Sequence, residues 1–263
     1  MVSAVFIGQK NNNSFDLSFV EMKIISLIPS ITELLFDLGL EDEVVGITKF
    51  CVHPQTWFRN KTRIGGPKSI DIEKINLLQP DLIIANKEEN VKEQIEQLQS
   101  RNVIVTDVNN YEEALEMIQS VGRLVRKEVE ALHLIKSIQQ KFSSLQIKEQ
   151  KTAAYLIWKA PYMTIGHDTF IHSMMERAGF KNVFSQWNRY PTITIDELKN
   201  LQPEYILLSS EPYPFKQKHI EELSPMLPHQ KMMLVDGEMF SWYGSRMLLA
   251  AEYFGQLSSN YID

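Results

Sequence analysis

Short apolar runs alternate with helix-patterned segments along most of the chain. The run KIISLI, from Lys23 to Ile28, is rich in β-branched residues and is stopped by Pro29, which predicts a buried strand. The segment that follows has apolar residues at helical spacing, and Ser30 and Glu33 have the spacing of a capping box at its start. We therefore expect a strand followed by a helix that begins near Ser30.

Further strands are expected in both halves of the chain. Each is a short apolar run, and the runs are 44–48, 81–85, 102–107, 153–158, 205–210 and 231–236. Helical patterns separate most of them. Because strands that alternate with helices pair in parallel through right-handed crossovers, the sequence predicts an α/β fold with mainly parallel sheets.

One stretch of this pattern is written twice. IDIEKINLLQPDLII begins at Ile70 and ITIDELKNLQPEYIL begins at Ile193, with the same apolar spacing before a shared Leu-Gln-Pro. Asp71 is expected to cap the first helix, and Thr194 with Glu197 forms the capping-box pattern of the second. The repeat indicates two similar lobes, with a cleft between them.

The residues between the two lobes are almost entirely helix-forming. From Tyr111 to about Leu145 there is no proline, and only Gly122 weakens the pattern. We expect one long backbone helix here that joins the lobes. The predicted organisation is an N-terminal α/β lobe at 23–110, a linking helical segment at 111–150 and a C-terminal α/β lobe at 151–263.

Composition limits the function rather than the fold. The chain has 263 residues, of which 44% are hydrophobic and 23% charged, and this is enough for proper cores in two lobes. Its net charge of -6, without a block of Lys and Arg, gives no reason to expect nucleic-acid binding. Cys51 is the only cysteine, so an internal disulfide or a cysteine-rich metal cluster is excluded.

The chain shows no signal for membrane insertion or for export. No stretch reaches the roughly 20 apolar residues that a membrane helix needs. The start, MVSAVFIGQKNNNSFDLSF, has no basic region and only a short apolar run before its Asn cluster, so it makes a poor export signal. Three alternatives stay open: a cytoplasmic protein, a leader that this sequence lacks, or a translation start at Met22.

Three stretches carry a resemblance to a known family. IISLIPSITELLFDLGLEDEVVGIT, IDIEKINLLQPDLIIAN and FSWYGSRMLLAAEYF resemble the helical-backbone, or class III, periplasmic substrate-binding proteins of ABC importers, and the branch for cobalamin and iron complexes is the most similar. The resemblance runs from about Lys23 to the end. It departs at Pro67 and Asn86, where the cobalamin-binding protein has tryptophans.

The resemblance implies a function as well as a fold. It implies a monomer that captures a small-molecule metal chelate (a corrinoid, haem or ferric siderophore) between its lobes and delivers it to an ABC permease dimer. It also implies a periplasmic or lipid-anchored location, although no export signal is visible. No resident cofactor is expected.

Aromatic and charged side chains gather after the predicted strands, where parallel sheets bind ligands. Flat aromatic faces suit a large chelate, because they bury its area without rearrangement. The expected ligand-binding residues are Phe50, His53, Trp57, Asn86, Lys87, Trp158, Tyr162, Arg189, Tyr190, Glu211, Tyr213, Phe215, Trp242, Tyr243 and Arg246. For any one of the aromatic residues, a place at the edge of the core is the alternative.

Two acids in the repeated stretch are candidates for docking to the permease. Glu73 and Asp196 occupy equivalent places in the first turn of the two helices. In the importer proteins that the chain resembles, one carboxylate from each lobe at these places meets permease arginines. The simpler alternative is that each acid only complements its helix dipole. Docking predicts that both acids are exposed on one cleft-bearing face, one on each lobe.

Metal binding and catalysis find little support in the sequence. His53 and His167 are the best candidates for metal ligands, but no HxH or HExxH spacing occurs, and His133, His172 and His219 fall on predicted helices without a partner nearby. No nucleophile elbow, P-loop or dinucleotide motif is present. The alternatives to an importer component are a tetrapyrrole metal chelatase, with His167 and Glu211 as the reacting pair, and a cytoplasmic carrier of the same ligands.

Overall fold

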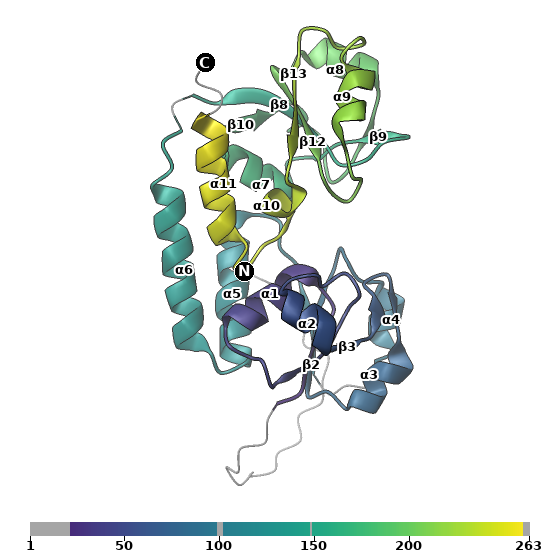
Figure 1. The fold of residues 1–263 in the computed structure, drawn as a ribbon, viewed down its shortest axis with the longest axis vertical. Coiled ribbons are helices and arrows are strands. Elements are labelled where there is room, and N and C mark those ends of the chain that lie inside the picture. Colours follow the sequence, from purple (N-terminus) through teal and green to yellow (C-terminus); the bar gives the residue numbers. More distant parts are fainter. Residues whose placement is uncertain (1–21, 99–101, 148, 260–263) are drawn as a thin grey trace. The chain divides into compact units, whose positions relative to one another are not determined.

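The structure is a computed structural model that describes residues 22–98, 102–147 and 149–259. Its contacts divide the chain into two compact units. The first takes the residues up to Asp107 together with Leu115–Ile135, and the second takes Val108–Ala114 and the chain from Lys136 onward. Each unit contains one parallel sheet with helices, which confirms the α/β class (Figure 1). None of the described helices has the length and hydrophobicity that crossing a bilayer requires.

The first unit is built on a five-stranded sheet in the order β3-β2-β1-β6-β7. All neighbouring strands pair in parallel. The strands are β1 (Ile24–Ser26), β2 (Val44–Ile47), β3 (Thr62–Arg63), β6 (Leu82–Asn86) and β7 (Val103–Thr106), and the helices between them are α1 (Pro29–Asp37), α2 (Gln55–Asn60), α3 (Ile72–Leu78) and α4 (Lys92–Glu96). A short antiparallel ribbon, β4 (Gly65–Gly66) with β5 (Ser69–Ile70), precedes α3.

The predicted capping box at the start of α1 is wrong. The helix begins one residue earlier, at Pro29, with Ile28 as its N-cap and no side-chain cap. Proline suits the first helical position because its φ is already helical and it has no N–H to leave unpaired. Ser30 is therefore inside the helix and buried.

The second unit repeats the plan with four parallel strands in the order β10-β8-β12-β13. The strands are β8 (Lys151–Leu156), β10 (Phe180–Asn182), β12 (Tyr205–Ser209) and β13 (Lys231–Val235), and the helices are α7 (Phe170–Arg177), α8 (Ile195–Leu201), α9 (Gln217–Leu223), α10 (Gly237–Ser241) and α11 (Met247–Ser259). An antiparallel ribbon, β9 (Tyr162–Met163) with β11 (Thr192–Ile193), follows β8.

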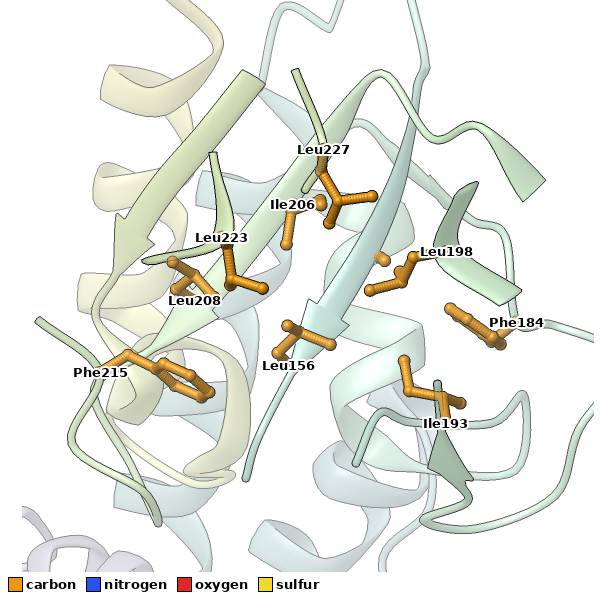
Figure 2. Close-up of a cluster of buried hydrophobic side chains, with 10 residues drawn as sticks. Leu156, Phe184, Ile193, Leu198, Ile206, Leu208, Phe215, Leu223 and Leu227 are labelled. Carbon is orange, nitrogen blue, oxygen red and sulfur yellow. The ribbon is translucent and has the colours of Figure 1, made fainter. Parts of the chain in front are cut away.

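Side chains from both faces of this sheet are buried. Leu156 of β8 and Leu208 of β12 point to one face, where Leu198 of α8 and Leu223 of α9 pack against them (Figure 2). Because successive strand residues point to opposite faces, Tyr155 lies on the other face, where its ring is 5.1 Å from that of Phe240. Helices therefore cover both faces, and the polar edge at the carboxyl ends of the strands is left for function.

The two copies of the repeated stretch fold alike. Asp71 accepts a hydrogen bond from the Lys74 amide over 3.1 Å, and Thr194 and Glu197 form the expected capping box. These two predictions are confirmed. Both helices end at a glutamine in the left-handed region before the shared proline, Gln79 with φ 49° and Gln202 with φ 46°.

The segment predicted as one long helix is two helices. They are α5 (Tyr111–Leu124) and α6 (Glu128–Ser143), and Arg126 between them has φ 57°. A Cβ on Gly122 would lie 2.4 Å from the Cβ of Ala131, so the glycine lets the two helices approach closely. The left-handed Arg126 and this close approach turn the chain back where helix propensity alone predicted continuity.

Candidate ligand-binding site

Glu211 organises the carboxyl ends of β12 and β13 in the second unit. Its Oε1 accepts hydrogen bonds from the Ser241 hydroxyl over 2.6 Å and from the Trp242 indole N–H over 2.9 Å. A Cβ on Gly237 would lie 2.5 Å from the Cγ of Glu211, so only glycine lets α10 start this close to the carboxyl side chain. The carboxyl group thus holds the tryptophan that follows α10.

The surroundings of Glu211 favour its neutral form. Burial is the main cause that raises the pKa of this carboxyl group, and the nearby carboxylates of Glu238 and Asp236 raise it further. The hydrogen bonds from Ser241 and Trp242 oppose the shift, because they stabilise the charged form. Glu211 therefore acts as a half-buried acceptor for its two donors.

Trp242 is held from its face as well as from its edge. The Arg246 guanidinium lies 5.1 Å from the centroid of the indole ring, and its Nη1 is 3.3 Å from Oε2 of Glu238. Trp242, Tyr243 and Arg246 are all buried. The indole N–H and the indole ring are therefore both engaged by neighbouring side chains inside the fold.

Two aromatic side chains that are accessible to solvent lie on the loops that follow β8 and β12. Trp158 is 41% exposed, and its ring centroid is 5.6 Å from that of Tyr213, which is half-buried. Phe215 is buried in the core (Figure 2). Its ring centroid is 4.8 Å from that of Tyr213. Because β8 and β12 are neighbours, their carboxyl ends bring these two loops together. We name Trp158 and Tyr213 the aromatic face.

Arg189 is fixed by polar contacts that the sequence did not reveal. Its amide donates to Asp168 over 2.5 Å, and its Nη1 donates to Oδ1 of Asn109 and to the carbonyl of Asp168, each over 3.0 Å. The guanidinium lies 5.6 Å from the ring centroid of Tyr190. Tyr190 and Tyr162, both expected in the ligand site, are half-buried. Asn109 lies eighty positions from Arg189 and in no motif, so no sequence signal links them.

A cavity of about 700 Å³ in this unit is lined in part by Arg189. Its walls are mostly amide, imidazole and carboxyl side chains, and they are Asn109, Asn110, Glu112, His167, Asp168, His172, Ser173, Glu176 and Arg189. His167 is exposed here, and its Nδ1 is 3.0 Å from the Trp187 carbonyl. Glu211, the other chelatase candidate, instead accepts hydrogen bonds from Ser241 and Trp242.

Two of the expected residues in the first unit are core residues. Trp57 is fully buried, packs edge-on against Phe36 at 5.4 Å and donates its indole N–H to Glu41. Asn86 is also buried, and its Oδ1 accepts from the amides of Glu88 and Glu89, which shapes the turn after β6. Both side chains are used inside the fold, so we leave them out of the proposed site.

The other three residues expected in this unit are accessible. Phe50 is 55% exposed, and the Lys49 ammonium lies 5.3 Å from its ring centroid. His53 is half-buried, and exposed Lys87 forms an ion pair with Asp107 at 2.6 Å. Within residues 22–98, 102–147 and 149–259, no group of three or more His, Cys, Asp or Glu side chains is arranged to hold a metal ion.

A family model described as periplasmic binding protein matches residues 24–230. The chain belongs to this family. The match covers most of both units, including the two copies of the repeated stretch, Gln79 and Gln202 among them. The predicted resemblance is therefore confirmed at the level of the family.

Similar proteins extend across nearly the whole chain of this periplasmic binding protein. An uncharacterized ABC transporter substrate-binding lipoprotein, YvrC of Bacillus subtilis (strain 168), is 26% identical over 95% of this chain and 84% of its own length. A vitamin B12-binding protein of Photorhabdus laumondii is 25% identical, over 92% of this chain and 90% of its own length.

Solved structures share the fold. The periplasmic heme-binding protein RhuT from Roseiflexus sp. RS-1 in apo form has a TM-score of 0.76 at 18% identity, and covers 92% of this chain and 98% of its own. The vitamin B12-binding protein BtuF of Vibrio cholerae has a TM-score of 0.69 at 21% identity, and covers 90% of this chain and 97% of its own. At these identities the likeness speaks for the architecture alone.

The two acids of the repeated stretch are both on the surface of this periplasmic binding protein. Glu73 in α3 is exposed, and the Asp196 side chain in α8 is 86% exposed. The Asp196 carboxylate lies 3.3 Å from Nζ of Lys199, one helical turn away. An exposed ion pair of this kind contributes little to the stability of the fold. Each acid is therefore available to a partner. The expectation that the two acids face the same way stays a prediction.

Proposed function

We propose that this chain captures a metal chelate (a corrinoid, haem or ferric siderophore) and presents it to an ABC permease. The observation that carries the proposal is the aromatic face of Trp158 and Tyr213, placed at the carboxyl ends of adjacent strands and supported by the core through Phe215. Aromatic surface held in advance binds a large flat ligand without an ordering cost.

Relatives that are named for their ligands support the class of ligand. Several similar proteins are named vitamin B12-binding proteins, and structures of the same fold are titled heme-binding proteins or part of an Fe3+-hydroxamate transport system. These names share a large chelate built around a metal. The aromatic face suits this class better than a small hydrophilic solute.

The same proposal covers location, partner and activity. We infer a periplasmic or lipid-anchored protein that binds as a monomer and is not an enzyme, in line with a family of binding proteins. The permease contact is proposed to run through Glu73 and Asp196, whose exposure leaves both carboxylates available. Contacts of exposed charges act mainly on orientation and encounter rate, and they weaken with salt.

A ligand panel tests the proposal. The purified chain is titrated with cyanocobalamin, haemin and a ferric trihydroxamate, while absorbance and tryptophan fluorescence are recorded. We expect saturable quenching by at least one of these chelates, because Trp158 is exposed in the aromatic face. Saturation by none of them, with the protein shown to be folded by circular dichroism, would reject the chelate class.

A further inference from the structure

His219 fastens the loop that carries the aromatic face. The loop between β12 and α9 ends at Lys216, and the Lys216 amide donates to Nδ1 of His219 over 2.8 Å. The imidazole ring also packs against Tyr213 and Phe215, with both ring centroids at 5.4 Å. His219 is buried, so this imidazole is a structural part of the loop.

A chain of contacts runs from this imidazole to the exposed tryptophan. Nε2 of His219 is 3.3 Å from the Tyr213 hydroxyl, and the Tyr213 ring meets Trp158 edge-on at 5.6 Å. Tyr213 is therefore supported by the aromatic rings of Trp158 and Phe215 and by a polar contact of its hydroxyl with His219. The orientation of Tyr213, and through it the aromatic face, depends on the state of the imidazole.

The contacts of His219 fix its neutral tautomer. Nδ1 accepts a hydrogen from the Lys216 amide, so the ring proton must be on Nε2, where it is donated to the Tyr213 hydroxyl. A second proton would occupy Nδ1 and turn the acceptor into a donor. The Lys216 amide would then face an N–H group and lose its partner, which is unfavourable for a buried polar group.

The charges around His219 oppose the second proton on balance. Burial is the first cause that lowers the pKa of His219, and the ammonium groups of Lys159, after β8, and Lys218, on α9, lower it further. The carboxylate of Glu222 on α9 acts in the other direction. Lys159 also forms an ion pair with Glu222, which reduces the effect of both on the imidazole.

We propose that His219 is the positioning residue of the aromatic face, and that its protonation releases Tyr213 and lowers the affinity for the ligand. Only the predicted loss of ligand affinity rests on the proposed function. The positioning of Tyr213 and Trp158 by His219 concerns the unliganded chain, and it can be tested without any ligand.

The unliganded test follows Trp158 fluorescence with pH. The emission of Trp158 is isolated as the difference between the wild type and Trp158→Phe, because the chain has four tryptophans. We expect this difference spectrum to change as the pH falls from 7.5 to 5. In His219→Gln it should stay flat, because a glutamine at the third helical position accepts from the N-cap amide and does not titrate.

A matched histidine variant is the control. His229→Gln removes an exposed histidine of the same unit and should leave the wild-type pH profile intact. An unchanged Trp158 spectrum across this pH range in the wild type, or the same change in His219→Gln, would overturn the positioning role.

The liganded test measures the dissociation constants of cyanocobalamin, haemin and a ferric trihydroxamate over the same pH range. We expect a loss of affinity of about two- to tenfold on acidification in the wild type and a flatter profile in His219→Gln. Equal profiles in the two proteins would overturn the link to binding. If none of the three chelates binds at any pH, the proposed function fails, while the fluorescence test still decides the role of His219.

Discussion

The indole N–H of Trp242 points at Oε1 of Glu211 over 2.9 Å and so joins the residue after α10 to the loop after β12. The bond puts a half-buried carboxyl group next to a buried aromatic ring at one edge of the second sheet. Burying a carboxylate away from water costs free energy unless hydrogen bonds or an opposite charge compensate for the lost hydration. Glu211 therefore gives this edge both its rigidity and its sensitivity to pH.

The Glu211→Gln variant should be more stable than the wild type at neutral pH. The pKa of Glu211 is raised by burial above the ordinary 4.5, so its favourable contribution is fully present below that value and is lost as the pH rises through the folded-state pKa. Glutamine keeps an oxygen acceptor for Ser241 and Trp242 without ionising. Urea unfolding at pH 7.5 and pH 4 measures the effect.

The pH dependence separates this explanation from a simple change in packing. We expect the gain of Glu211→Gln at pH 7.5 to shrink or reverse at pH 4, where the wild-type side chain is neutral as well. Glu221→Gln, an exposed acid on α9, should show no such trend. A gain of the same size at both pH values would argue against the ionisation of Glu211 as the cause.

Removal of the exposed indole should weaken ligand binding without unfolding the protein. Trp158→Ala takes away half of the aromatic face, and we expect an affinity loss of about tenfold for whichever chelate of the panel binds. Fluorescence or absorbance titration gives the dissociation constant. The control is Met226→Ala, which removes an apolar side chain of similar exposure before β13, at the opposite ends of the strands. Equal losses in the two variants would remove Trp158 from the site.

Charge reversal of the two repeated acids should separate delivery from capture. Glu73→Lys combined with Asp196→Lys places cations where the proposed permease arginines would meet carboxylates, so ligand uptake should be lost. Affinity for the ligand in solution should stay at the wild-type value. Uptake by cells that carry the variant, together with titration of the purified protein, measures both.

A second pair of acids, also one from each unit, controls for overall charge. Glu93→Lys with Glu221→Lys changes two exposed acids on α4 and α9 and should leave uptake intact. Normal uptake by the Glu73 and Asp196 double variant would leave helix-dipole stabilisation as the role of these acids. A loss in both double variants would point to net charge instead.

Glycine at the end of either repeated helix should stabilise the chain. Gln79 has φ 49°, where a side chain is strained and glycine is not, and its side chain is exposed. We expect Gln79→Gly to raise the free energy of unfolding by up to about 1 kcal/mol. Asn76→Gly, inside α3, should lower it by about 0.5 kcal/mol. Chemical unfolding that shows the same sign for both variants would contradict this account.

Local patterns in the sequence determined the elements of the fold. The sequence shows the strands, the helix caps at Asp71 and Thr194, and the helix ends before Pro80 and Pro203. All of these features rest on interactions within a few residues, which a sequence displays directly. The duplicated stretch predicted two similar units for the same reason. One local signal misled: the capping-box spacing at Ser30 was overridden by the proline beside it.

Only the tertiary structure decided which side of each element faces the core. Trp57 and Trp158 both follow strands in the sequence, yet one is fully buried and the other is 41% exposed, because burial depends on the partners that the fold brings alongside. The turn between α5 and α6 likewise rests on the approach of Gly122 to Ala131. The contact of Glu211 with Trp242 joins segments that follow two different strands, β12 and β13, so it arises only when the sheet sets these strand ends side by side.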